Sequence, residues 1–227
     1  MKPINLVILI IAAAELFVEY ADNPQIRYVV KPLPILLLIY SLRDKPTKME
    51  KFTAYGLSFS VVGDVLLSMK GHNFFLAGTG FFLVAHIFYV VAFQFPNTSA
   101  INQKTQAPSL GLYLCCGIIC IVAALSMMNS WNMVSDRWLI IPYAVVLTAM
   151  VCCAILRKDK TTSASFKCAI LGSVLFMASD NILATLKFHN YKTVWGQIIV
   201  MATYYLGQFF ITMGAHRHEP VIHHHSS

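Results

Sequence analysis

Two aspartates, Asp64 and Asp180, have the positions in this chain that most strongly indicate chemistry. Each lies inside an apolar stretch long enough to cross a bilayer, in FSVVGDVLLS and FMASDNILAT. An ionised aspartate in the middle of a membrane costs about 2.5–3.5 kcal/mol even on the lenient insertion scale, so such residues usually have a functional role. The pair therefore predicts carboxylate chemistry within the membrane.

The composition is that of an integral membrane protein. Of the 227 residues, 57% are hydrophobic and 12% are charged, which leaves too little polar surface for a water-soluble domain of this size. The hydrophobic pattern predicts an all-α, multi-pass bundle of eight transmembrane helices, with residues 1–214 as one domain and 215–227 as a flexible polar tail. The predicted segments are 4–20, 29–42, 53–69, 74–95, 109–128, 138–156, 167–187 and 193–214.

The distribution of positive charge predicts the orientation. With eight spans, both termini lie on the same side as the loops 43–52, 96–108 and 157–166. That side carries eleven of the 17 lysines and arginines, so both termini are expected in the cytoplasm, with the protein in an inner or plasma membrane. The net charge of +7 is then explained by the orientation of the chain in the membrane and by contact with anionic lipids. The sequence contains no basic groove or motif typical of nucleic-acid binding.

A weak internal repeat relates the two aspartates. A shift of 116 residues aligns 51–93 with 167–209 and places Asp64 on Asp180. The alignment is compatible with a parallel duplication of four helices each, although similarity of this kind also arises by chance between apolar helices. A duplication would set both carboxyl groups at a similar depth.

Other polar residues are predicted near the depth of the aspartates. Asp64 lies about 7 Å and Asp180 about 10 Å from the non-cytoplasmic ends of their helices. Glu15 shares that depth on the first helix. The residues expected to bind substrate, or to orient water or an aspartate, are Glu19, Lys31, His86, Tyr89, Asn181, Tyr204, Tyr205 and Gln208.

These residues also have structural interpretations. Glu15, Glu19 and Lys31 are close enough to the interface to snorkel to water or to pair with one another. An isolated His86 in an apolar helix is more often a hydrogen-bonded core residue than a metal ligand. The two aspartates could form a structural salt bridge with Lys31, or remain neutral and bond to a helix carbonyl.

Motifs for several other chemistries are absent from the sequence. It contains no G-x-S-x-G elbow, no Walker loop, no H-E-x-x-H and no cluster of membrane histidines that could hold zinc. His216, His218 and the histidines at 223–225 belong to a charged terminal segment, where adventitious metal binding is the better explanation. We therefore expect no metal and no other cofactor.

Two buried carboxyl groups can divide the roles of acid and base. Burial disfavours the charged form of one, which can then donate a proton near neutral pH. Lys31 or hydrogen bonds from Tyr89, Tyr205 or Gln208 can keep the other ionised, so that it activates water. This is the logic of acid-assisted C–O cleavage through an oxocarbenium-like state.

Five sequence blocks resemble the YhhN family of multi-span lysoplasmalogenases, in the family's order and over nearly the whole chain. They are K-P-L-P at 31–34, G-L-S-F-S-V-V-G-D-V-L-L at 56–67, G-x-x-F-F-L-V-A-H-I-F-Y at 78–89, S-D-N-I-L-A at 179–184 and Y-Y-L-G-Q at 204–208. The resemblance implies a hydrolase that cleaves the vinyl-ether bond of lysoplasmalogens to a fatty aldehyde and a glycerophospho-headgroup. It also implies that Asp64 and Asp180 are the catalytic pair. The partner is then a lyso-ether phospholipid of the membrane, and no obligate protein partner is evident.

The expected mechanism is protonation of the vinyl carbon by one aspartate and activation of water by the other, with both assignments open. A small proton-coupled transporter is the strongest alternative, because buried carboxylates, an interfacial cation and a repeat also occur in carriers. The repeats of carriers are commonly inverted, however, and Gly or Pro interruptions at mid-helix are few here. A non-catalytic lipid-binding or scaffold protein is the third alternative.

Overall fold

The fold is a bundle of α-helices. The computed structural model describes residues 3–20, 30–44, 46–69, 71–95, 110–130, 137–158, 160–189 and 193–217. Within these ranges the chain forms eight helices and no strand, as the apolar segments predict. The helices are α1 (Pro3–Tyr20), α3 (Leu33–Ser41), α4 (Lys48–Ser68), α5 (His72–Phe93), α6 (Leu110–Ser130), α7 (Arg137–Ile155), α8 (Ser163–Phe188) and α9 (Val194–His216).

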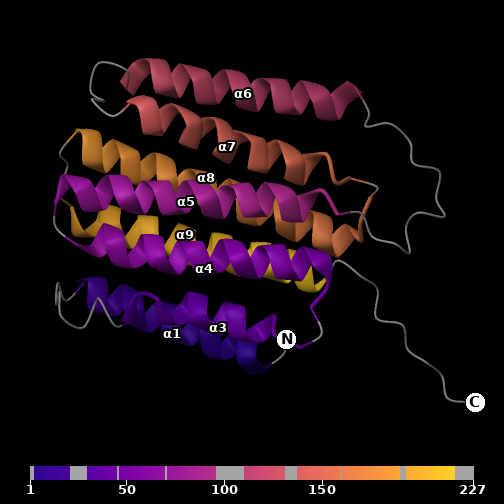
Figure 1. Ribbon diagram of the computed structural model, residues 1–227, viewed down its shortest axis with the longest axis horizontal. Coiled ribbons are helices and arrows are strands. Elements are labelled where there is room, and N and C mark those ends of the chain that lie inside the picture. Colours follow the sequence, from indigo (N-terminus) through magenta and orange to yellow (C-terminus); the bar gives the residue numbers. More distant parts are fainter. Residues whose placement is uncertain are drawn as a thin grey trace, which may run out of the picture.

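The helices lie side by side with nearly parallel axes (Figure 1). α6 lies at one edge of the bundle beside α7, and α1 lies with α3 at the opposite edge. Between them, α4 packs mainly along α5, and α8 packs mainly along α9, while α4 also touches α9 and α5 touches α7. The helix pairs α4–α5 and α8–α9 therefore form the centre of the molecule, and they carry both aspartates.

Small residues allow the close approach of α8 and α9. A Cβ atom at Gly172 would lie 2.7 Å from the backbone nitrogen of Ile211 and 2.8 Å from the carbonyl oxygen of Gly207. A larger residue at position 172 would therefore push the two backbones apart. Such glycine contacts are common between helices in membranes, where close packing replaces the hydrophobic effect.

Hydroxyl side chains begin three of the helices. Thr47 caps α4 in a capping box with Glu50, in which each side chain bonds the backbone N–H of the other residue. Thr162 caps α8, and Thr193 caps α9. These caps satisfy backbone donors that the first helical turn leaves free, and they fix where each helix starts.

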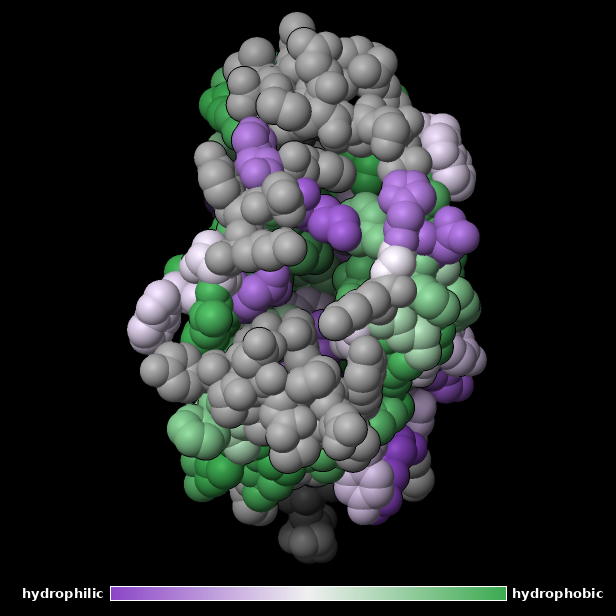
Figure 2. All heavy atoms as spheres, turned by 90° about the vertical axis from the view of Figure 1, so that its left-hand side faces the viewer, coloured by the Kyte–Doolittle hydropathy of each residue, from purple (hydrophilic) through white to green (hydrophobic). Residues whose placement is uncertain are grey.

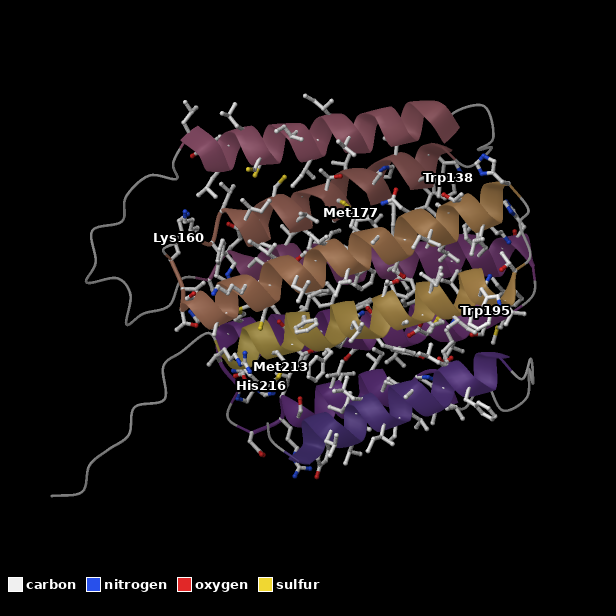
Figure 3. All side chains as sticks on the ribbon, turned by 180° about the vertical axis from the view of Figure 1, so that it is seen from behind. Trp138, Lys160, Met177, Trp195, Met213 and His216 are labelled. Carbon is white, nitrogen blue, oxygen red and sulfur yellow. The ribbon has the colours of Figure 1, made fainter. Side chains whose placement is uncertain are left out.

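The surface of the bundle is that of a helical membrane protein. Four helices are long and apolar enough to cross a membrane, namely α5, most of α7, α8 and α9. Trp138 and Trp195 are 70% and 68% exposed and lie at the same end of the bundle (Figure 3), as tryptophans at a membrane interface do. On the end of the bundle shown in Figure 2, hydrophilic residues lie among hydrophobic ones.

Two predicted segments differ from the structure in extent. Within the segment 29–42, the described residues form the nine-residue helix Leu33–Ser41; Val30 is also helical, a turn at 31–32 separates the two, and position 29 lies outside the described residues. At about 1.5 Å per residue this helix is too short to cross a bilayer by itself. At the end of the bundle α9 continues to His216, and positions 218–227 of the predicted tail lie outside the described residues.

Candidate functional site

Asp64 is buried in α4 and faces α9. The residue is 2% exposed, and the Tyr204 hydroxyl donates a 2.7 Å hydrogen bond to its Oδ2 atom. Lys31 is also buried, and it forms no direct ion pair with Asp64. The structural salt bridge considered for Asp64 is therefore not formed, and a tyrosine is its direct partner.

Asp180 is held in α8 by a second tyrosine. The Tyr143 hydroxyl of α7 donates a 2.6 Å hydrogen bond to Oδ2 of Asp180. The Nε2 atom of His86, on α5, lies 3.8 Å from the same oxygen. His86 is fully buried, and neither of its ring nitrogens has a well-formed hydrogen bond within the protein.

The ring of Phe176 lies between His86 and Tyr204, the partners of the two aspartates. Its centroid is 4.6 Å from that of His86 and 5.3 Å from that of Tyr204, with edge-to-face geometry in both contacts. Phe176 is itself fully buried. The Asp64–Tyr204 pair and the Asp180–His86 contact thus lie against a shared aromatic side chain, and an apolar ring separates the two partners of the aspartates.

Each central helix pair supplies a partner for the aspartate of the other pair. Asp64, on α4, is bonded by Tyr204 of α9, whereas Asp180, on α8, is approached by His86 of α5. Neither helix pair can build this arrangement alone. The candidate site therefore depends on the docking of α4–α5 against α8–α9.

A hydrogen-bonded cluster lies one helical turn from the Asp64–Tyr204 pair. The Tyr89 hydroxyl donates to Oε1 of Gln208 at 2.7 Å, and Nε2 of Gln208 donates to the Ser60 hydroxyl at 3.1 Å. Ser60 and Gln208 are each four positions from Asp64 and Tyr204 along their helices, so the cluster extends the polar interior. The neighbouring Tyr205 hydroxyl donates to the backbone carbonyl of Lys31 at 2.9 Å, which ties α9 to the start of α3.

Three further residues were predicted at this depth, and of these Asn181 points away from the site. Asn181 is exposed, and its amide donates to the carbonyl of Met177 on its own helix, away from the groups described above. Glu15 is fully buried on α1. The side chain of Glu19 lies outside the described residues. The remaining predicted residues, which the structure brings into the bundle core, are Lys31, Asp64, His86, Tyr89, Asp180, Tyr204, Tyr205 and Gln208.

Tyr143, Ser60 and Phe176 also belong to the site and were not predicted from the sequence. A tyrosine in the apolar segment 138–156 was a usable signal for Tyr143, because its position indicates a depth similar to that of Asp180. Ser60 and Phe176 precede Asp64 and Asp180 by four positions, which places each on the same helix face as its aspartate. Inspection of that spacing alone would have found both.

An all-helical bundle with long apolar helices and two carboxyl groups on its inner helices defines a helical membrane protein with a polar interior site. The model of the YhhN family matches residues 26–215, so the chain belongs to the YhhN family. This confirms the resemblance carried by the five sequence blocks.

Curated relatives of the chain have names that agree with one another. A lysoplasmalogenase homolog from Dictyostelium discoideum is 26% identical, over 82% of this chain and 76% of its own length. A Mycobacterium tuberculosis lysoplasmalogenase is 28% identical, over 69% of this chain but 57% of its own length. A human lysoplasmalogenase is 26% identical, over 74% and 67% of the two chains. No solved structure matches the chain.

Proposed function

We propose that this protein is a lysoplasmalogenase-like hydrolase that cleaves the vinyl-ether bond of lysoplasmalogens with Asp64 and Asp180. The observation that carries the proposal is that each aspartate, Asp64 buried and Asp180 partly buried, is held by a tyrosine hydroxyl from another helix, in a chain whose relatives are named lysoplasmalogenases. Buried carboxyl groups that are held in place and shielded from water are suited to acid–base catalysis.

The reaction follows from the chemistry of the bond. An acid protonates the vinyl carbon, and the double bond becomes an oxocarbenium ion. Water adds to that ion to give a hemiacetal, which collapses to a fatty aldehyde and the glycerophospho-headgroup. A carboxylate near the oxocarbenium ion stabilises its positive charge and can accept the proton of the attacking water. No step of this sequence requires a metal or a nucleotide.

The substrate would reach the site from the bilayer. Its single alkenyl chain can lie along apolar helix faces, with the headgroup at the interface, where Lys31 can attract the phosphate at longer range.

This proposal includes eight membrane spans with both termini in the cytoplasm, a parallel repeat of four helices, and His86, Tyr89, Tyr205 and Gln208 as residues that orient water or an aspartate.

Purified protein in detergent provides the test, because an enzyme needs no gradient and a carrier does. We expect fatty aldehyde from 1-alkenyl lysophosphatidylethanolamine or lysophosphatidylcholine. The matched 1-acyl lipid, which lacks the vinyl ether, should give none. Folded protein that releases no aldehyde in detergent, yet moves protons or solute across vesicles, would overturn the proposal in favour of the transporter.

A further inference from the structure

We propose that Lys187 binds the phosphate of the substrate, so that the lyso-ether lipid lies along α8 with its vinyl ether beside Asp180. This inference rests on the hydrolase function proposed above, and it names the residue of that site that recognises the headgroup. It follows from the positions of the two side chains on α8 and from their contacts with α5. It holds whichever aspartate acts as the acid.

Asp180 and Lys187 lie on the same face of α8. They are seven positions apart, which is close to two full helical turns, so their side chains leave the helix in nearly the same direction. Both side chains also contact α5. Oδ2 of Asp180 lies 3.8 Å from Nε2 of His86, and the Lys187 ammonium lies 4.8 Å from the ring centroid of Phe75. The carboxyl group and the cation therefore both point toward the same neighbouring helix.

The distance between these groups fits the substrate. Seven residues of α-helix rise by about 10.5 Å. In an extended lysoplasmalogen, seven bonds separate the vinyl carbon that takes the proton from the phosphorus atom, which corresponds to about 9 Å. The flexible side chain of a lysine covers the small difference. A phosphate bound at Lys187 therefore sets the vinyl ether beside Asp180.

The depth of the two groups matches the usual orientation of a lipid. Lys187 lies in the last turn of α8, and α9 begins soon afterwards with Trp195 in its first turn. Trp195 and Trp138 lie at this end of the bundle (Figure 3), where tryptophans mark the level of the headgroups. Lys187 thus lies near the phosphate level and Asp180 lies deeper, so the alkenyl chain continues toward the middle of the membrane.

Access also distinguishes this face of α8. Lys187 is exposed and the Asp180 side chain is 14% exposed, whereas Asp64 as a residue is 2% exposed. A lipid that approaches α8 from outside the bundle therefore meets Lys187 and Asp180 before it meets Asp64.

Lys187 also has donors available for an anion. Among the described residues, no carboxylate forms an ion pair with it, and its ammonium lies over the ring of Phe75. A cation over an aromatic face keeps N–H donors for a phosphate on its other side. Lys31 is 6% exposed, and its backbone carbonyl is bonded by Tyr205 within the bundle. Lys187 is therefore placed for direct contact with the phosphate, and Lys31 for attraction at longer range.

Two substrates, with and without the phosphate, test this role. 1-Alkenyl lysophosphatidylethanolamine carries the phosphate, whereas 1-alkenylglycerol has the same vinyl ether and no charge. For K187Q we expect KM for the phospholipid to rise by about 3–10-fold with kcat nearly unchanged, because a contact made equally in the ground and transition states is lost. KM for 1-alkenylglycerol should stay at the wild-type value. K187R keeps the charge and should restore most of the affinity for the phospholipid.

The control is K51Q, which removes an exposed lysine from the first turn of α4 and should leave KM for both substrates unchanged. All variants should unfold in detergent at temperatures close to that of the wild type, since the changed side chains are exposed. An unchanged KM of K187Q for the phospholipid, or an equal rise for both substrates, overturns the role of Lys187 while the hydrolase function stands. Absence of aldehyde from the wild type with the phospholipid overturns the proposed function instead.

Discussion

The Tyr204 hydroxyl on α9 donates a 2.7 Å hydrogen bond to Oδ2 of Asp64 on α4, although the two residues are 140 positions apart in the chain. Asp180 on α8 has a comparable partner in Tyr143 on α7, at 2.6 Å. Each buried carboxyl group is thus satisfied by a hydroxyl from a different helix, as polar groups in an apolar interior must be. Two helices therefore have to be in register for each carboxyl group, and four helices hold the pair.

Removal of either tyrosine hydroxyl should lower catalysis. We expect Y204F to lower kcat for aldehyde release by about 10–100-fold, because a hydrogen bond to a charged group contributes about 1.5–3 kcal/mol. Y143F removes the comparable bond to Asp180 and should lower kcat by a similar factor. Steady-state assays in detergent measure both, with Y113F on the exposed face of α6 as the control. Equal activity of Y204F and wild type would contradict the role of Tyr204.

A change of Lys31 to glutamine separates two roles for its charge. If Lys31 mainly attracts the substrate phosphate, KM rises and kcat is unchanged. Because Lys31 is buried and its backbone is held by Tyr205, next to the Asp64 partner Tyr204, we expect kcat to fall and KM to change little. Separate determination of kcat and KM with K31Q decides between them, and a rise confined to KM would favour the phosphate role. K51Q, on the exposed surface of α4, is the control.

Truncation of Phe176 should destabilise the protein strongly. The F176A variant should lose about 3–5 kcal/mol of unfolding free energy, because it leaves a cavity among His86, Tyr204 and neighbouring rings. F74A, on the exposed surface of α5, should cost much less. Thermal or denaturant unfolding in detergent compares the two. Similar stability of both variants would show that the contacts of Phe176 contribute little.

Two glycine-to-alanine changes should have opposite effects. In G172A the new Cβ would meet backbone atoms of α9 at 2.7 and 2.8 Å, so the helices must separate and the unfolding temperature should fall. At Gly80 a Cβ would meet nothing within 4 Å, so alanine should be neutral or stabilise α5 by up to about 1 kcal/mol. Differential scanning fluorimetry of the purified variants tests the contrast, and a G172A protein as stable as G80A would argue against this packing.

The helices could be predicted well from the sequence, because hydropathy over a window reports burial or lipid contact directly. The segment 138–156, for example, corresponds to α7 (Arg137–Ile155). Prediction was poorer for 29–42, where the described helix is shorter. Apolar composition extends beyond the helix there, and Pro32 and Pro34 restrict how the segment can begin.

The site could be predicted only in part. The cost of a charge in an apolar helix identified Asp64 and Asp180. The positions of Tyr204 and His86 along their predicted helices indicated a similar depth in the membrane. Depth does not give the rotation of a helix about its axis, however, so the sequence could not show that Tyr143 faces Asp180. That contact depends on how α7 packs against α8.

Helix rotation also explains the one predicted residue that points away. Asn181 is next to Asp180 in sequence, yet successive helical residues are separated by about 100° around the axis. Since Asp180 faces inward to Tyr143, Asn181 lies on an exposed face and bonds to Met177.

Aldehyde release by D64N and D180N tests the central claim most directly. Both variants, and the wild type, should be purified in detergent at matched purity and compared with 1-alkenyl lysophospholipid as substrate. If the two buried carboxyl groups carry the chemistry, the wild type releases aldehyde and each variant falls to near background while it unfolds at a temperature close to that of the wild type. Substantial retained activity in either folded variant would contradict the account.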